Sequence, residues 1–369
     1  MVSAYKDNSR SYLCWVKFLL IPFALIYSVI VIIRNILYDF RVLKSTEFDF
    51  PVIAVGNLRV GGTGKTPMIE YLIRMLQSKS RIGVLSRGYG RKTKGFILGD
   101  LESSPEQIGD EPLQIKSNFP SVLLAVDEQR VRGISKLMQT GDSRPQVILL
   151  DDAMQHRKVS PGYILMLTAY DKLFIDDFVL PVGRLREPRF LANRADVIVV
   201  TKCPSSLSLQ DRYKVSRRIQ SDSEKPVFFA HELYGAMRQV QNPNMELSAA
   251  DLSELSVVLF TGLADASQLL KWVKTKAHNV EHLEFGDHHW FSVRDVESIK
   301  SRFENVDNQK KIILTTQKDV KRISKLLQNE KFADLPIYCI MHEMSMFEED
   351  QVPFEKMIND FIRSYSTNN

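Results

Sequence analysis

The sequence of 369 residues predicts an α/β fold with a mainly parallel sheet, and three observations support this. Short apolar runs alternate with stretches of helical periodicity, which is the pattern of βαβ units. The runs are apolar throughout, as in Val52–Val55, and this is typical of strands buried on both faces. Glycine-rich and polar segments follow several of the runs, at the strand ends where parallel sheets bind ligands. The hydrophobic content of 44% is enough for a sizeable core.

The charge and the cysteine content exclude several classes of protein. The formal net charge is +5, from 49 basic and 44 acidic residues, which is small for this length and does not indicate nucleic-acid binding. Cys14, Cys203 and Cys339 have no paired metal-ligand spacing, which argues against a disulfide scaffold and against a cysteine-based zinc site. We therefore expect a reducing compartment.

The first 44 residues differ in composition from the rest. The segment Phe18–Ile33 is apolar except for one serine and one proline, and it approaches the length of about twenty residues that spans a bilayer. We expect residues 1–44 to form a membrane-associated helix, spanning or lying in one leaflet, with a buried core helix as the alternative. No small-x-small cleavage site follows, which disfavours a signal peptide. The basic residues Arg34, Arg41 and Lys44 indicate that the following chain lies on the cytoplasmic side.

The segment after the first predicted strand has the features of a phosphate-binding loop. Its glycines allow successive backbone N–H groups to surround phosphate oxygens at the start of the next helix. Lys65 adds a positive charge, and the Thr66 hydroxyl can bind Mg²⁺. The common pattern has glycine at position 59, where this chain has arginine, and Gly56 lies three places earlier. The residues expected to bind nucleotide are Arg59, Val60, Gly61, Gly62, Thr63, Gly64, Lys65 and Thr66.

Acidic residues follow this loop at three places. Asp151 and Asp152 end the predicted strand Val147–Leu150, where nucleotide-hydrolysing proteins place the carboxylate that meets Mg²⁺; a simple strand-ending turn is the alternative. Asp110, beside Glu111, is by its residue type alone a helix N-cap. The segment 287–289, Asp-His-His, is either a general-base relay or a polar turn.

Two basic segments are candidate phosphate contacts. Arg87 lies in a glycine-punctuated loop after the predicted strand Ile82–Leu85. Arg184, Arg186 and Arg189 surround Glu187; by default they form a solvated face, although a guanidinium fork also suits a phosphate-bearing substrate. His156 could orient a phosphate or be structural.

The chain after about residue 226 predicts a second, smaller α/β lobe. Helical segments separate four further predicted strands, at Val257–Phe260, Glu281–Phe285, Ile312–Leu314 and Ile337–Ile340. The expected division is therefore a helix over 1–44, a phosphate-binding core over 45–225 and a C-terminal lobe over 226–369.

Five segments, in this order, resemble the tetraacyldisaccharide 4'-kinases of lipid A biosynthesis. The resemblance implies a P-loop kinase core, ATP and Mg²⁺ as cofactors, and phosphorylation of the 4'-hydroxyl of an acylated glucosamine disaccharide 1-phosphate to give lipid IV-A. It also implies a location at the cytoplasmic face of the bacterial inner membrane. The segments are Val55–Thr66, Leu85–Tyr89, Gly109–Pro112, Asp151–Arg157 and Leu185–Pro188.

The resemblance also assigns roles to single residues. Asp110 matches the catalytic base and His288 its partner, which replaces the N-cap interpretation. Lys65 and Asp152 complete the catalytic set, and Thr66, Glu111, Asp151 and Asp152 are the expected metal contacts. At the histidine the family often has Pro-Asp-His, where this chain has Gly-Asp-His-His over 286–289. The residues expected to contact the substrate are Asn57, Arg87, Tyr89, Gln155, His156, Arg186 and Glu187.

A membrane-associated P-loop ATPase or a GTPase switch, without a small-molecule phosphoacceptor, is the alternative. A switch GTPase needs glycine after the strand-ending aspartate and an Asn-Lys-x-Asp segment, whereas this chain has Ala153 and, at 201–204, Thr-Lys-Cys-Pro. Membrane-positioning ATPases usually carry a second lysine just before the glycine pair, where this chain has Val60. Both alternatives are disfavoured.

Overall fold

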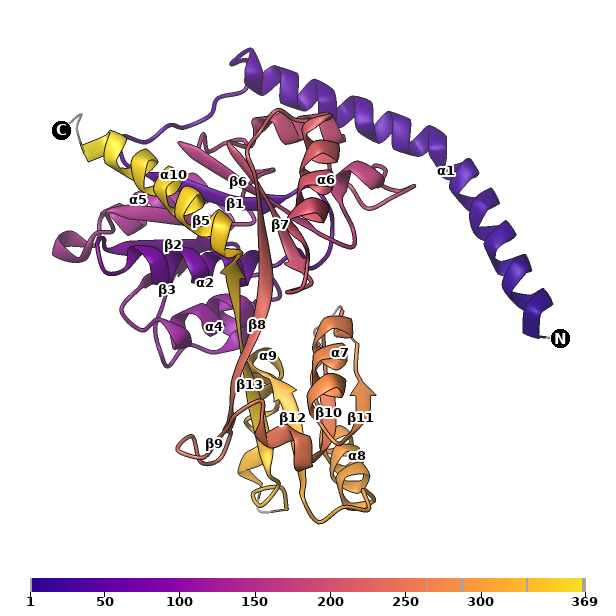
Figure 1. The fold of residues 1–369 in the computed structure, drawn as a ribbon. Helices are drawn as coiled ribbons and strands as arrows, with labels where there is room; N and C mark the ends of the chain where they lie inside the picture. Colours follow the sequence, from indigo (N-terminus) through magenta and orange to yellow (C-terminus); the bar gives the residue numbers. More distant parts are fainter. Residues whose placement is uncertain (1, 264, 287–288, 330, 367–369) are drawn as a thin grey trace. The chain divides into compact units, whose positions relative to one another are not determined.

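The computed structural model describes residues 2–263, 265–286, 289–329 and 331–366 (Figure 1). The chain divides into two compact units: the first contains Met1–His231 and Met344–Asn369, and the second contains Glu232–Glu343. The expected C-terminal lobe over 226–369 differs from this division. The last residues return to the first unit, where Phe354 and Ile358 of the C-terminal helix join the main core.

The first unit is built on one sheet in which β1 is central. The strand order is β8-β7-β6-β1-β5-β2-β4-β3; among the described strands of this order, β3 alone pairs antiparallel to its neighbour. Strands that follow β1 in the chain lie on both sides of it, and open α/β sheets bind ligands at such a switch point. The strands are β1 (Val52–Asn57), β2 (Ile82–Ser86), β3 (Ile97–Gly99), β4 (Leu123–Val126), β5 (Val147–Asp151), β6 (Tyr163–Ala169), β7 (Val197–Cys203) and β8 (Val227–Gln239).

Helices cover both faces of this sheet (Figure 1). Because side chains alternate along a strand, Ile53 and Val55 of β1 pack on the side of α2, whereas Val52 and Ala54 pack on the side of α5. All four side chains are almost fully buried, as expected for a central parallel strand. The helices are α1 (Val2–Asp39), α2 (Lys65–Leu76), α3 (Pro105–Ile108), α4 (Asp110–Asn118), α5 (Arg130–Met138), α6 (Leu209–Gln220) and α10 (Glu348–Ser366).

Helix α1 contains the apolar segment that was predicted to associate with a membrane. Its part Phe18–Asp39 has a mean hydropathy of 2.2 and is long and apolar enough to cross a bilayer, a test that core helices and signal sequences also pass. Most of this segment is exposed, but Val31, Asn35 and Tyr38 are buried against the first unit. The exposed apolar side chains include Phe18, Leu19, Phe23, Leu25, Ile26, Val29, Ile30 and Ile33.

The second unit is a smaller α/β layer structure. Its parallel strands have the order β11-β10-β12-β13, and the short strand β9 (Glu246–Leu247) pairs with the distal part of β8. Two apolar clusters lie in this unit. Its other elements are β10 (Ser256–Thr261), α7 (Ser267–Lys276), β11 (Asn279–Glu284), α8 (Val293–Glu304), β12 (Lys311–Thr316), α9 (Gln317–Ile323) and β13 (Ile337–Met346).

Candidate active site

The loop between β1 and α2 has the backbone of a phosphate-binding loop. Gly61 and Gly64 have φ angles of 118° and 80°, a region that residues with a Cβ rarely adopt. Gly64 occupies the N-cap position of α2, and Lys65 is the first helical residue. The Lys65 ammonium lies 3.5 Å from Asn57 Oδ1 and 3.7 Å from Asp152 Oδ1. The loop therefore places its lysine beside Asp152, one of the two acids at the end of β5.

The first residues of the expected nucleotide loop contact a neighbouring segment of protein. The Arg59 guanidinium is 2.7 Å from Asp177 Oδ2, and the Val60 N–H donates to the carbonyl of Arg184 at 2.8 Å. Asn57 Nδ2 donates to the carbonyl of Arg59. The start of the loop is thus held by the segment around residues 177–185.

Gly56 lies where the chain after β5 passes over β1. A Cβ at this position would lie 2.5 Å from Met154 Cβ and 3.0 Å from Met154 N. Real Cβ atoms essentially never approach a neighbour this closely, so only glycine fits. Because of this close approach, the turn that carries Asp152 and Gln155 packs directly against β1, the strand that precedes the phosphate-binding loop.

Asp151 is a buried carboxylate with one oxygen available. It is 4% exposed, and Ser86 Oγ donates to its Oδ2 at 2.9 Å. Its Oδ1 is buried and has no hydrogen-bond partner among the described residues. Burial and the negative charge of Glu111 raise the pKa of Asp151 to about 6, and Lys65 opposes the shift. A buried acceptor without a donor, close to other acids, fits a bound cation or its water ligands.

Asp152 has a strained backbone and two cationic neighbours. Its φ angle of 47° lies in the left-handed region, which is uncommon for a residue with a Cβ. Arg186 NH1 donates to both carboxylate oxygens, at 2.9 and 3.0 Å. Burial by itself raises the pKa of Asp152, but Lys65 and Arg186 outweigh it and the net shift is downward. Asp152 therefore remains ionised beside the phosphate-binding loop.

The metal contacts expected from the sequence are not a closed protein cage. Among the residues that the structure describes, no group of three or more His, Cys, Asp or Glu side chains could hold a metal ion. Mg²⁺ commonly has one or two carboxylates and takes its other ligands from water and phosphate. The open oxygen of Asp151, with Asp152 next in the chain and the buried Thr66 in the first turn of α2, fits that mode of binding.

The loop that carries Asp110 is packed backbone to backbone against the loop that carries Tyr89. A Cβ at Gly109, whose φ is 93°, would lie 2.8 Å from the carbonyl oxygen of Tyr89. Gly109 is the N-cap residue of α4 and Asp110 is the first residue of the helix, so Asp110 does not take the capping position that its residue type favours. The charge of Glu111 raises the pKa of Asp151, which indicates that the two carboxylates are neighbours.

A network of polar side chains joins the remaining substrate candidates. Gln155 Nε2 donates to the carbonyl of Asn57 at 2.9 Å and to Glu187 Oε2 at 3.3 Å, and its Oε1 accepts from Arg186 at 3.2 Å. Glu187 is buried and forms a short ion pair with Arg194. Four of the seven predicted substrate residues therefore lie in one connected group.

The other three predicted substrate residues are Arg87, Tyr89 and His156. Arg87 is exposed and Tyr89 is 76% exposed. Burial, followed by the charges of Arg130 and Arg87, lowers the pKa of His156 to about 4. His156 is therefore a neutral imidazole near pH 7.

The structure adds Arg130 to the site, which the sequence analysis did not single out. Its side chain is buried, donating to the carbonyl of Asp127 at 2.6 Å and to the carbonyl of Asp151 at 3.4 Å. Burial lowers its pKa to about 10, so the group remains charged. An arginine two residues after the acidic pair 127–128 was the available signal, but only the fold brings it to Asp151.

Helix α1 contacts the same polar network. The Tyr27 hydroxyl donates to the carbonyl of Arg186 at 2.9 Å, and Arg34 donates to the carbonyl of Gln155 at 3.1 Å. Asn35 Nδ2 donates to Glu187 Oε1 at 3.2 Å. The apolar helix is thus joined to the segments that carry the substrate candidates.

The second unit contains the segment with the expected histidine. Asp287 and His288 lie outside the described residues. Near them, His289 Nε2 is 3.1 Å from Asp295 Oδ2, and its ring stacks on Phe285.

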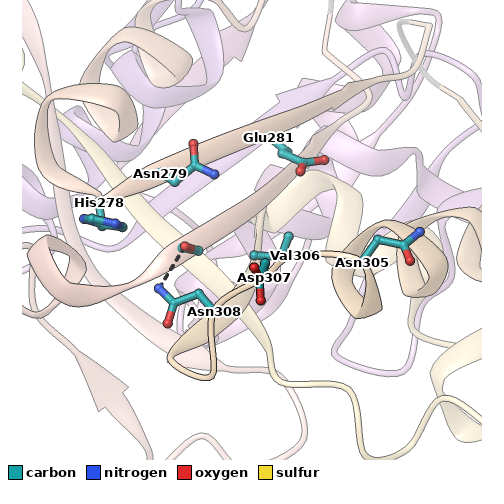
Figure 2. Close-up of a pocket in the computed structure, with 8 residues that line it drawn as sticks. His278, Asn279, Glu281, Asn305, Val306, Asp307 and Asn308 are labelled. Carbon is teal, nitrogen blue, oxygen red and sulfur yellow. Dashed lines mark hydrogen bonds between the residues drawn. The ribbon is translucent and has the colours of Figure 1, made fainter.

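A cavity of about 530 Å³ opens in this unit at the starts of β10 and β11 (Figure 2). Its lining includes Ser256, which accepts from Asn308 Nδ2 at 3.0 Å, and also His278 and Asp307. No candidate residue from the sequence lines it. It lies at the amino ends of these strands, whereas open parallel sheets bind ligands at the carboxyl ends.

Comparison with known proteins agrees with this arrangement. The family model described as tetraacyldisaccharide-1-P 4'-kinase (LpxK) matches residues 16–363. A Flavobacterium johnsoniae tetraacyldisaccharide 4'-kinase is 46% identical over 329 residues, covering 89% of this chain and 94% of that protein. The Bacteroides thetaiotaomicron enzyme of the same name is 38% identical over 358 residues, covering 95% and 94%.

A solved structure matches as well. The crystal structure of LpxK from Aquifex aeolicus in complex with ATP has a TM-score of 0.72 and 29% sequence identity, covering 94% of this chain and 99% of that chain. The P-loop core and the mainly parallel sheet predicted from the sequence are confirmed. The chain therefore belongs to the tetraacyldisaccharide-1-phosphate 4'-kinase family, and it is a kinase.

Proposed function

We propose that this kinase transfers the γ-phosphoryl group of ATP to the 4'-hydroxyl of a tetraacyl glucosamine disaccharide 1-phosphate, giving lipid IV-A. The observation that carries the proposal is the convergence of Lys65 and Asp152, 3.7 Å apart, at the switch point of the sheet, next to the buried Asp151. Family membership supplies the identity of the acceptor. The alternative of an ATPase or a GTPase switch without a phosphoacceptor is not favoured, since the matching relatives are named as kinases.

Nucleotide binding falls to the loop and its lysine. The N–H groups at the start of α2 and the Lys65 ammonium neutralise the phosphates, since a helix N-terminus favours negative charge. Thr66, Glu111, Asp151 and Asp152 would hold Mg²⁺, which when bound neutralises charge that develops on the β- and γ-phosphates. Although burial raises the pKa of Asp152, Lys65 and Arg186 lower it by more, so the carboxylate is ionised beside the loop, where Arg186 holds it by hydrogen bonds.

Proton removal from the sugar hydroxyl falls to Asp110. The backbone contact between Gly109 and Tyr89 fixes the start of α4, so the carboxylate is carried on a rigid element rather than on a free loop. His288 is the expected partner of this base, by the resemblance. In-line transfer then depends on positioning and charge neutralisation.

The exposed apolar face of α1 supports an association with a membrane. Its apolar side chains suit the hydrocarbon of a membrane, and its buried face contacts the carbonyls of Gln155 and Arg186. We place the chain at the bacterial inner membrane with its catalytic body on the cytoplasmic side, where ATP is available. The helix would hold the site close to an insoluble substrate.

The test is phosphate transfer from γ-labelled ATP to a purified tetraacyl disaccharide 1-phosphate in detergent. Wild-type protein should label the lipid in a Mg²⁺-dependent manner. Lys65→Ala should abolish turnover, and Asp110→Ala should lower kcat by about 10²–10⁴-fold, the usual contribution of a general base, while ATP binding is kept. Label appearing only as inorganic phosphate would favour the ATPase alternative, and near-native kcat for Asp110→Ala would remove Asp110 from the base role.

A further inference from the structure

The end of strand β7 lies directly against the phosphate-binding loop. The Thr201 hydroxyl is buried and donates to the carbonyl of Thr63 at 2.8 Å. The register of β7 against β8 shifts between Val200 and Cys203, so the backbone here departs from regular pairing. Irregularities of this kind often occur next to active sites, where they redirect a side chain. The redirected residue at this position is Lys202.

Lys202 has a backbone conformation that its residue type does not favour. Its φ angle is 56°, and Lys202 is one of three described non-glycine residues with positive φ, together with Arg41 and Asp152. A lysine gains no local hydrogen bond from the left-handed region, unlike asparagine or aspartate. Strained residues held by the surrounding structure cluster at functional sites, and Asp152 of the same site is a second example.

The Lys202 side chain reaches the mouth of the loop. Its Nζ lies 3.8 Å from the point that a Cβ on Gly62 would occupy, and no other heavy atom of the described structure, chain neighbours aside, lies within 4 Å of that point. Gly62 is exposed, so the ammonium stands at the open side of the loop.

We propose that Lys202 is a second phosphate-binding lysine of the nucleotide site, contributed by β7 rather than by the loop. Membrane-positioning ATPases usually carry a second lysine at the position of Val60, and here the fold brings a lysine to Gly62 from 140 residues further along the chain. The ligand is the polyphosphate of a nucleoside triphosphate, so this inference rests on the ATP-binding part of the proposed function. An ammonium is suited to this role because phosphate accepts it as a point charge.

Glycine and asparagine variants separate charge from backbone strain. Lys202→Gly removes the ammonium and suits the left-handed backbone, and Lys202→Asn is a second neutral variant that tolerates this region. Lys202→Arg keeps the charge. Arg41→Gly is the matched control, because Arg41 has a similar φ of 59° and is exposed at the end of α1. ATP affinity is measured on the full chain by calorimetry with Mg²⁺ and without lipid.

We expect the two neutral variants to bind ATP about tenfold more weakly than wild type, with a smaller salt dependence, whereas Lys202→Arg stays within about threefold and Arg41→Gly within about twofold. KM for ATP should rise while KM for the lipid acceptor is unchanged. Neutral variants with wild-type ATP affinity would overturn the assignment. Equally weak binding by Lys202→Arg would do the same, because it would show a need for lysine shape rather than charge. Failure of the wild type itself to bind ATP would instead refute the proposed function.

Discussion

Substituting Gly56 by alanine tests whether the contact between β1 and the following turn holds the site together. The added Cβ would lie 2.5 Å from Met154 Cβ and 3.0 Å from Met154 N, whereas carbon atoms in good contact are about 3.5–4.0 Å apart. Met154 is 3% exposed and packs in an apolar cluster, so its Cβ cannot move without its backbone. The turn must therefore shift by about 1 Å to restore normal contact.

This shift affects both the stability of the protein and its catalytic rate. Overpacking of a buried position costs about 1–3 kcal/mol of stability, and the upper part of this range applies because the contact involves backbone. The displaced turn carries Asp152 and Gln155, and a misplacement of about 1 Å can reduce catalysis by about 10²-fold. Gly56→Ala should therefore lose far more activity than its folded fraction explains.

The assay combines chemical or thermal unfolding with kcat/KM for lipid phosphorylation. Gly83→Ala is the matched steric control, since its Cβ would lie 2.9 Å from Pro145 Cγ near the amino end of β2, away from the carboxyl-end site. It should lose stability but keep its kcat. The reasoning is refuted if Gly56→Ala retains wild-type kcat, or if Gly83→Ala loses as much activity.

The remaining predictions concern two buried acids. Asp151→Asn should remove most phosphoryl transfer yet stabilise the metal-free protein by about 3 kcal/mol above pH 7, at 1.36 kcal/mol per pKa unit. The pKa of Asp151 is raised from 3.8 to about 6 in the folded state, so the wild type loses stability as pH rises from about 4 to 6. Urea unfolding in EDTA at pH 5 and pH 8 should show a larger difference in unfolding free energy between Asp151→Asn and the wild type at pH 8. An equal difference at the two pH values would contradict the shift. Glu187→Gln should cost about 3–5 kcal/mol by leaving Arg194 without its buried counter-charge, and should loosen α1, as measured by unfolding and by proteolysis of the helix; wild-type resistance would count against this coupling.

Strands that obey the βαβ pattern were predicted well. The expected runs Val52–Val55 and Val147–Leu150 are present and extend to Asn57 and Asp151. Strand β6, which the sequence analysis missed, follows β5 without an intervening helix. Its apolar run Tyr163–Ala169 comes directly after irregular turns, so the alternation that revealed the other strands was absent.

The C-terminal helix shows a different limit. The sequence analysis did not predict this helix, and an apolar helix face does not indicate which of several cores it joins. Only the fold selects the first unit, where Phe354 packs edge-on against Phe228 of β8. For the same reason the boundary of the second unit could not be read from composition, since both chain crossings occur within strands.

The sequence by itself determined the local chemistry of this protein: a glycine-rich loop that can hold phosphate, paired acids at a strand end, and an apolar N-terminal helix. These depend on neighbouring residues, whose backbone preferences and spacing are visible in the chain. The tertiary structure alone decided which groups meet, such as Asp152 with Arg186, Arg130 with Asp151, and Lys202 with Gly62. Such contacts follow from strand order and register, which are fixed by burial across the whole sheet rather than by any single segment.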